Sequence, residues 1–412
     1  MLIEYPLSCL SNHNQLLQQM TERLGVEPLR WGAVSCDEED EMISIEAIPC
    51  PWPVNKLKPI ERAVSKSKLG VMLIPTGLGC SIGGFGGDAN LCANLLAGEF
   101  DHLVINPNVV NGGAWQNIPQ NSFYVEGLAV DLFMCGQLAL RPVTSNKIGV
   151  IFDKAIPDEL LQRELEVIKA TECIWGIDCL GYTLTEGPLE YSLQLLDSNC
   201  SSGNINNPQV LLNAADKLKA RGAQAIAVVC HFDEKDPDKF QLPDEAVHNY
   251  QQGQGPDPIG GLEAIISHLI TRYSLLPCAH APCLSETSCF AENATSIDMR
   301  VSPEKTSFSF LPSVLKGLSK APRLITQEQL SVGDLTVHNV QAFMGPANCW
   351  GGSSFILAAH NQFIRCYAVQ SNLSKANVNP ELLSPHIKKV TNYFELIGHL
   401  RAQSLGLKFV NY

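Results

Sequence analysis

Short apolar runs recur along the chain from about residue 68 onward, and longer amphipathic segments separate them. The runs that we read as strands cover residues 70–75, 102–106, 147–152, 223–231, 340–346 and 364–369. Strands of a parallel sheet are buried on both faces, so they are apolar throughout rather than alternating. Such strands, separated by helices, predict an α/β fold of Rossmann-like type, with a mainly parallel sheet covered by helices.

The first 60 residues follow a different pattern. A helix near residues 14–24 and strands near 29–35 and 42–48 predict a small α/β unit. The alternating prolines of residues 49–53 prevent both a helix and a central strand, so this stretch is a candidate linker. We therefore expect a small N-terminal α/β unit (1–60), a first α/β half (68–230) and a second α/β half (231–412).

A glycine-rich loop follows the first apolar run, and a helix at residues 89–97 follows the loop. The glycines let the backbone approach a ligand closely, and the free N–H groups of a helix start favour phosphate or carboxylate. The loop matches neither a P-loop nor a clean dinucleotide fingerprint. A tight crossover with Asp88 as helix N-cap is the alternative. The candidate ligand-binding residues of this loop are Thr76, Gly77, Gly83, Gly84 and Asp88.

Two further loops follow strands in the same way. The first carries Asn106, Asn108 and Asn111, whose amides can orient an amide or carboxylate, although Asn-Pro and Asn-Gly are also ordinary turn sequences. The second is a glycine-rich turn that echoes the first loop in outline. It adds Asn348, Gly351, Gly352 and Ser353 as candidate ligand-binding residues.

One apolar strand ends in Cys230, His231 and Asp233. A thiol beside a histidine is a candidate nucleophile, but strand neighbours point to opposite faces, so a partner histidine has to come from elsewhere. His268 and His280 can supply it. The candidate catalytic residues are therefore Cys230, His231, His268 and His280, and an inert buried thiol is the alternative for Cys230.

Two other groupings give weaker signals. Cys278, His280 and Cys283 lie close in sequence, but their spacing matches no common zinc module, and we assign no metal site. Glu126 and Asp131 are five residues apart and therefore not squarely on one helical face, which is weak support for a carboxylate pair.

Composition and charge limit the classes of partner that the protein can bind. The formal charge is 29 − 42 = −13 with no basic cluster, which argues against nucleic acid or an anionic membrane surface. Fifteen cysteines, an odd number mostly within apolar runs, indicate reduced thiols and a cytoplasmic location. No apolar run approaches the ~20 residues that span a bilayer. The sequence indicates no particular cofactor. It leaves the oligomeric state open, and a homo-oligomer is one of the possible states.

Parallel strands bring their carboxyl ends to one edge of a sheet. We therefore expect the loops after Pro75, Ile105 and Val229 to form one pocket, with the polar segment 233–258 as a cover. This arrangement predicts an enzyme that acts on a small anionic or amide-bearing metabolite, of hydrolase or isomerase type. The alternative is a non-catalytic metabolite-binding or scaffold protein.

Several motifs occur in the order of a known family: Pro-Thr-Gly-Leu-Gly-Cys-Ser-Ile-Gly-Gly at 75–84, Pro-Asn-Val-Val-Asn at 107–111, Tyr-Val-Glu-Gly at 124–127, Gly-Gly-Leu-Glu-Ala-Ile-Ile-Ser-His at 260–268 and Cys-Ala-His-Ala-Pro at 278–282. Over about residues 68–400 the chain resembles domain-of-unknown-function family 3326, found in cyanobacteria and plants. The resemblance implies a cytosolic or plastid-type soluble protein, and no catalytic residue is carried over from it.

Overall fold

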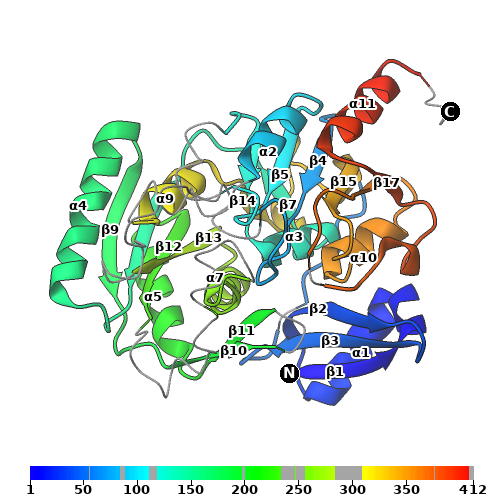
Figure 1. Ribbon diagram of the computed structural model, residues 1–412. Helices are drawn as coiled ribbons and strands as arrows, with labels where there is room; N and C mark the ends of the chain where they lie inside the picture. The colour runs from blue at the N-terminus through cyan, green and yellow to red at the C-terminus, as the bar shows by residue number, and fades with distance from the viewer. Residues whose placement is uncertain are drawn as a thin grey trace, which may run out of the picture.

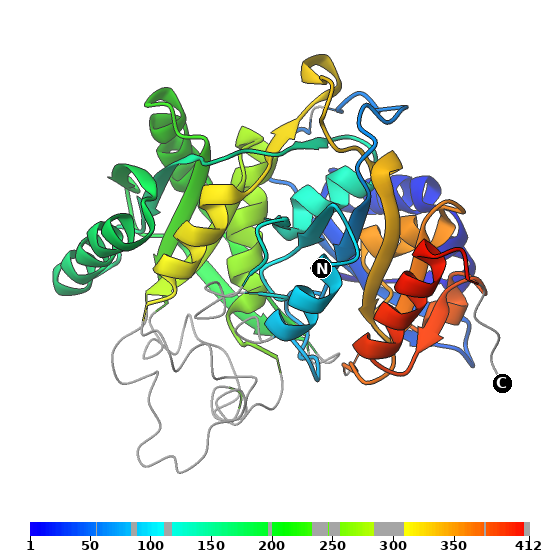
Figure 2. The ribbon, with the colours of Figure 1, turned by 90° about the horizontal axis from the view of Figure 1, so that it is seen from above.

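Two parallel sheets form the body of the molecule, and a small N-terminal unit packs against the part that holds the larger one (Figures 1 and 2). The computed structural model describes residues 1–54, 56–83, 89–110, 118–196, 200–232, 246, 256–283, 309–374 and 376–407. Parallel strands covered by helices confirm the α/β fold expected from the apolar runs.

The larger sheet has six parallel strands in the order β17-β16-β15-β4-β5-β6. They are β4 (Leu69–Met72), β5 (His102–Ile105), β6 (Ser122–Tyr124), β15 (Val340–Pro346), β16 (Arg365–Val369) and β17 (Lys388–Val390). Val71 and Phe343 pack on one face against α3 (Gly127–Met134) and α10 (Ser353–His360). Met72 and Met344 pack on the other against α2 (Asn90–Ala97) and α11 (Tyr393–Ser404). Burial on both faces explains why these strands are apolar throughout.

The second sheet has four parallel strands in the order β13-β12-β8-β9. They are β8 (Lys147–Phe152), β9 (Asp178–Leu184), β12 (Ala225–His231) and β13 (Cys278–Cys283). Ile226 and Val228 pack against α5 (Gln209–Ala220) and α7 (Gly260–Ser274), whereas Ala227 and Val229 pack against α4 (Asp158–Trp175) and α9 (Leu311–Lys320). In Figure 1 this sheet, in green, lies beside the larger one.

The two sheets do not coincide with the two expected halves of the chain. β12 and β13 pair with each other across the expected boundary between residues 230 and 231. β15 returns from the far part of the chain to pair with β4 in the larger sheet. The chain therefore leaves the larger sheet after β6, builds the four-stranded sheet, and comes back to complete the first. Apolar runs alone do not show which strands pair, because every run is equally suited to either sheet.

Short antiparallel pairs and 3₁₀ turns complete the described elements. The pairs are β7 (Ala139–Arg141) with β14 (Arg323–Ile325), and β10 (Tyr191–Leu195) with β11 (Ser201–Ile205). The 3₁₀ turns are η1 (Leu7–Ser11), η4 (Gln327–Gln329), η5 (Val337–Asn339) and η6 (Pro380–Leu382).

The N-terminal unit is an antiparallel sheet with one α-helix, and it docks closely on the larger sheet. Its strands are β1 (Leu2–Pro6), β2 (Pro28–Asp37) and β3 (Met42–Pro49), in the order β1-β3-β2, with helix α1 (His13–Leu24). Ala33 N donates to Gly351 O at 2.9 Å, just before α10. A Cβ on Gly351 would lie 2.0 Å from Ala33 O, so only glycine permits this approach.

Within the described part of the chain, no helix has the length and apolar character needed to cross a bilayer. The cysteines that the structure describes are free thiols.

Candidate functional site

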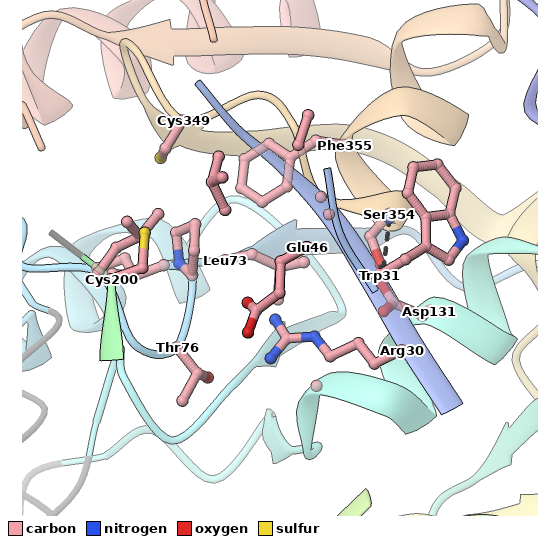
Figure 3. Close-up of a pocket in the computed structure, with 18 of the residues that line it drawn as sticks. Arg30, Trp31, Glu46, Leu73, Thr76, Asp131, Cys200, Cys349, Ser354 and Phe355 are labelled. Carbon is pink, nitrogen blue, oxygen red and sulfur yellow. Dashed lines mark hydrogen bonds between the residues drawn. The ribbon is translucent and has the colours of Figure 1, made fainter. Parts of the chain in front are cut away.

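A pocket opens at the carboxyl-terminal edge of the six-stranded sheet (Figure 3). Segments that follow β4, β5 and β15 line it together with the starts of α3 and β11 and with β2 and β3 of the N-terminal unit. Its empty volume, including the part open to solvent, is about 820 Å³. Polar side chains in its lining are Arg30, Glu46, Thr76, Asn106, Asp131, Ser201 and Ser354, with the thiols of Cys200 and Cys349.

Arg30 brings a positive charge to the pocket from β2. Its Nη1 lies 3.2 Å from His268 Nε2. Among the residues that the structure describes, no carboxylate is within ion-pair distance of this guanidinium. A guanidinium has five N–H donors, so most of those on Arg30 are available to a ligand.

Two buried side chains hold Arg30 in place. Glu126 is the N-cap of α3 and accepts a hydrogen bond from Leu128 N at 2.8 Å. His268 Nδ1 lies 2.9 Å from the same carboxylate. Because arginine can only donate, His268 Nε2 accepts from Arg30 and the ring proton sits on Nδ1, where it is donated to Glu126. Both ring nitrogens of His268 are therefore used within the protein.

Asp131 and Ser354 join α3 to the start of α10 in the pocket lining. Ser354 donates its backbone N, at 3.1 Å, and its hydroxyl to Asp131 Oδ1. Burial raises the pKa of the Asp131 carboxyl above its usual value, although the charge of Arg30 and the bonds from Ser354 oppose this rise. A carboxyl with a raised pKa is a candidate proton donor in a pocket.

Glu46 and Thr76 add two more polar groups to the same space. Figure 3 shows the Glu46 carboxylate, the Arg30 guanidinium and the Thr76 side chain directed toward the middle of the pocket. Cys200 and Cys349 lie together in a small apolar cluster. Burial raises the pKa of the Cys349 thiol well above its usual value, so this thiol is a poor candidate for a thiolate nucleophile.

Three of the ligand-binding residues expected from the sequence line the pocket: Thr76, Asn106 and Gly352. Asn106 uses its amide within the protein, because Oδ1 accepts from Ile74 N at 3.1 Å and Nδ2 donates to Ile74 O at 2.7 Å. Asn108 likewise donates to Pro75 O at 2.7 Å. These two asparagines shape the loop after β4.

Other candidates hold neighbouring segments together. Asn348 Nδ2 donates to the carbonyls of Ser374 and Ala376, each at 2.7 Å. Ser353 Oγ lies 3.0 Å from His13 Nε2. Gly77 and Gly83 have φ values of +80° and +74°, which favour glycine, and Gly351 makes the close approach to Ala33. Gly84, Asp88, Asn111, Asp233 and residues 234–245 and 247–255 of the expected cover lie outside the described residues.

Cys230 and His231 lie at the carboxyl end of β12 and His280 lies in the middle of β13, and none of the three is among the pocket-lining residues. The strand ends after β4 and β12 belong to different sheets and do not share an edge, contrary to the expectation of one pocket. Burial raises the pKa of Cys230 well above its usual value and lowers that of His280 to about 3. Of the four candidate catalytic residues, His268 is the one with a hydrogen bond, in the described part of the chain, to a pocket-lining side chain, Arg30.

In the described ranges, no three His, Cys, Asp or Glu side chains are grouped so that they could hold a metal ion. The pocket instead offers one arginine, a carboxylate, a carboxyl of raised pKa and hydroxyl groups. Among these groups, the guanidinium is of the kind that binds a carboxylate or phosphate, and the carboxylate can accept hydrogen bonds.

Comparison with known proteins gives a family and a relative. Residues 69–411 match the model of the family DUF3326, described as proteins of unknown function. The chain belongs to this family. The DUF3326 chain is also 37% identical, over 344 residues, to a protein of Synechococcus sp. named an uncharacterized lipoprotein; the alignment covers 84% of this chain and 93% of the relative. No solved structure matches the chain.

The most distinctive pocket residues lie outside the segment matched by the DUF3326 model. Arg30 and Glu46 belong to the N-terminal unit, whereas the match begins at residue 69. Sequence reasoning missed both, because a single arginine and a single glutamate on strands carry no motif. The one sequence feature that points to Arg30 and Glu46 is that both lie in the N-terminal unit, which leads directly into the candidate loops. The sequence suggests Asp131 only as a partner of Glu126, whereas in the structure Glu126 binds His268.

Proposed function

We propose that this DUF3326 protein is an enzyme that binds a small anionic metabolite in the pocket and transforms it by acid–base chemistry, of hydrolase or isomerase type. The observation that carries the proposal is Arg30. Its guanidinium reaches the pocket with most donors unused, and the buried chain from Glu126 through His268 holds it in one orientation.

An arginine in this setting is suited to carboxylate or phosphate. A guanidinium binds such groups through two parallel charge-assisted hydrogen bonds, and an arginine that is already fixed loses less side-chain entropy on binding. The Thr76 hydroxyl lies in the same pocket and can add a further hydrogen bond to a bound anion.

Asp131 supplies the acid–base function of the proposal. Burial raises its pKa, so its protonated form, which can give a proton to a ligand atom held beside Arg30, is more accessible than that of an exposed aspartate. Ser354 fixes the carboxyl by two hydrogen bonds, so the proton donor is oriented before the ligand arrives.

Non-catalytic binding of the same anion is the second candidate, and two observations favour it. Neither ring nitrogen of His268 is free, and the pKa of Cys349 is raised. The pocket therefore presents a binding group more plainly than a nucleophile.

A two-step experiment tests the proposal. Carboxylates and phosphate esters are screened by thermal shift, where a ligand at ~100 times its dissociation constant adds ~2.7 kcal/mol of stability. Each stabilising compound is then followed by NMR with the wild type and with Asp131→Asn. The enzyme proposal expects conversion by the wild type and binding without conversion by Asp131→Asn. Binding without conversion by both favours the second candidate, and no stabilising anion refutes both.

A further inference from the structure

We propose that the ligand of this pocket carries a positive group as well as a negative one, and that it is an amino acid or a close analogue of one. The negative group binds Arg30 and the ammonium binds Glu46. This inference deepens the proposed function and rests on it, because it assumes that Arg30 is the anchor for an anion.

The register of the N-terminal sheet places the two charges side by side. In the antiparallel pair β2–β3, Arg30 lies opposite Ile48 and Gly32 lies opposite Glu46. Residues opposite each other point to the same face, and so do residues two apart on one strand. Arg30 and Glu46 are therefore diagonal neighbours on one face of the sheet, and both line the pocket.

The two side chains are directed into the same space but do not neutralise each other. Both are among the described residues, and no ion pair or hydrogen bond joins them, although Figure 3 shows their charged ends near each other at the pocket. Gly32, which lies directly opposite Glu46, contributes no side chain beside it. Opposite charges that face the same pocket without an ion pair between them can each bind one end of a ligand that bridges them.

A ligand with both charges satisfies the pocket better than a simple anion. An anion bound to Arg30 would lie near the Glu46 carboxylate, and the like charges would repel each other. An ammonium on the same ligand turns that repulsion into a charge-assisted hydrogen bond. Glu46 is therefore expected to determine specificity for amino-bearing carboxylates over plain ones.

The test compares matched compounds on the wild-type protein by calorimetry. The probes are the twenty standard amino acids, β-alanine and γ-aminobutyrate, each set against the same acid without its amino group, such as alanine against propionate. We expect at least one amino compound to bind 10-fold or more tightly than its deaminated partner. Equal or tighter binding of the deaminated partners overturns the inference, and so does a panel without any binding member.

Two variants assign the effect to its residue. Glu46→Gln should weaken the amino compound at least 10-fold and leave its deaminated partner unchanged or slightly tighter. Glu61→Gln, the same change at an exposed site outside the pocket, should alter neither. An unchanged preference in Glu46→Gln contradicts the inference. If Glu46→Gln fails to fold, the wild-type comparison still decides.

The outcomes separate this inference from the proposed function. Plain carboxylates or phosphate esters that bind the wild type without any gain from an ammonium leave the anion pocket standing and refute the zwitterion. Failure of every carboxylate and phosphate ester refutes the anion pocket itself.

Discussion

Replacing Gly351 by alanine should loosen the N-terminal unit from the larger sheet. A Cβ at this position would lie 2.0 Å from Ala33 O and 2.8 Å from Ala33 C, so the backbone of β2 has to move. Overpacking of this kind costs roughly 1–3 kcal/mol. The bond from Ala33 N to Gly351 O, 2.9 Å in the wild type, is lost or stretched at a cost of about 0.5–1.5 kcal/mol. We expect a total destabilisation of about 2–4 kcal/mol.

Urea unfolding followed by tryptophan fluorescence measures this effect, because Trp31 on β2 is buried beside the contact. Gly398→Ala is the matched control. Gly398 lies inside α11 with nothing within 4 Å of its Cβ position, so alanine there should stabilise by roughly 0.5–1 kcal/mol. The same substitution should therefore lower the free energy of unfolding at Gly351 and raise it at Gly398. A Gly351→Ala protein as stable as the wild type would refute the close docking that places Arg30 in the pocket.

Three further predictions concern burial and charge. Burial raises the pKa of Glu263 well above its usual value, so Glu263→Gln should be more stable than the wild type at pH 8. The gain should vanish below about pH 4, where the carboxyl is protonated in both the folded and the unfolded state. Urea midpoints at the two pH values measure this gain, and an equal gain at both contradicts the prediction. Burial lowers the pKa of His280 to about 3, so the unfolded state gains the proton first and stability falls as the pH drops below about 6.5. His280→Gln should lessen that fall between pH 6.5 and 4 in the same unfolding assay, and an unchanged slope would show that His280 is not its source. Brief alkylation of the native protein should modify exposed Cys173 while sparing buried Cys230 and Cys278, as peptide mass mapping can show; early labelling of either buried thiol would argue against the packing of β12 and β13.

The sheet type could be predicted from the sequence because burial on both faces leaves a direct mark. The unbroken apolar runs at 70–75 and 223–231 correspond to β4 and β12, with ends that differ by a few residues. The apolar runs do not show which strands pair with one another. β4 pairs with β15, more than 250 residues later, and β12 pairs with β8 and β13. That choice depends on tertiary packing, and it separates Cys230 from the glycine-rich loop.

The pocket was only partly predictable for a related reason. Loops after parallel strands do line it, as the general rule for α/β sheets expects. Asparagines in turn sequences, however, serve the turn itself, as Asn106 and Asn108 do by binding the backbone of Ile74 and Pro75. Arg30 becomes visible only when the N-terminal sheet is docked, because nothing local to its strand indicates a ligand.

The central claim is that Arg30 anchors an anion in this pocket. Its most direct test is calorimetric titration of the anion that stabilises the wild type most, using the wild type, Arg30→Gln and Arg62→Gln, the last being the same change at an exposed arginine outside the pocket. Loss of a charge-assisted hydrogen bond of roughly 1.5–3 kcal/mol should weaken binding by Arg30→Gln about 10- to 100-fold, while Arg62→Gln stays within about twofold of the wild type. Equal affinity of Arg30→Gln and the wild type would contradict the account.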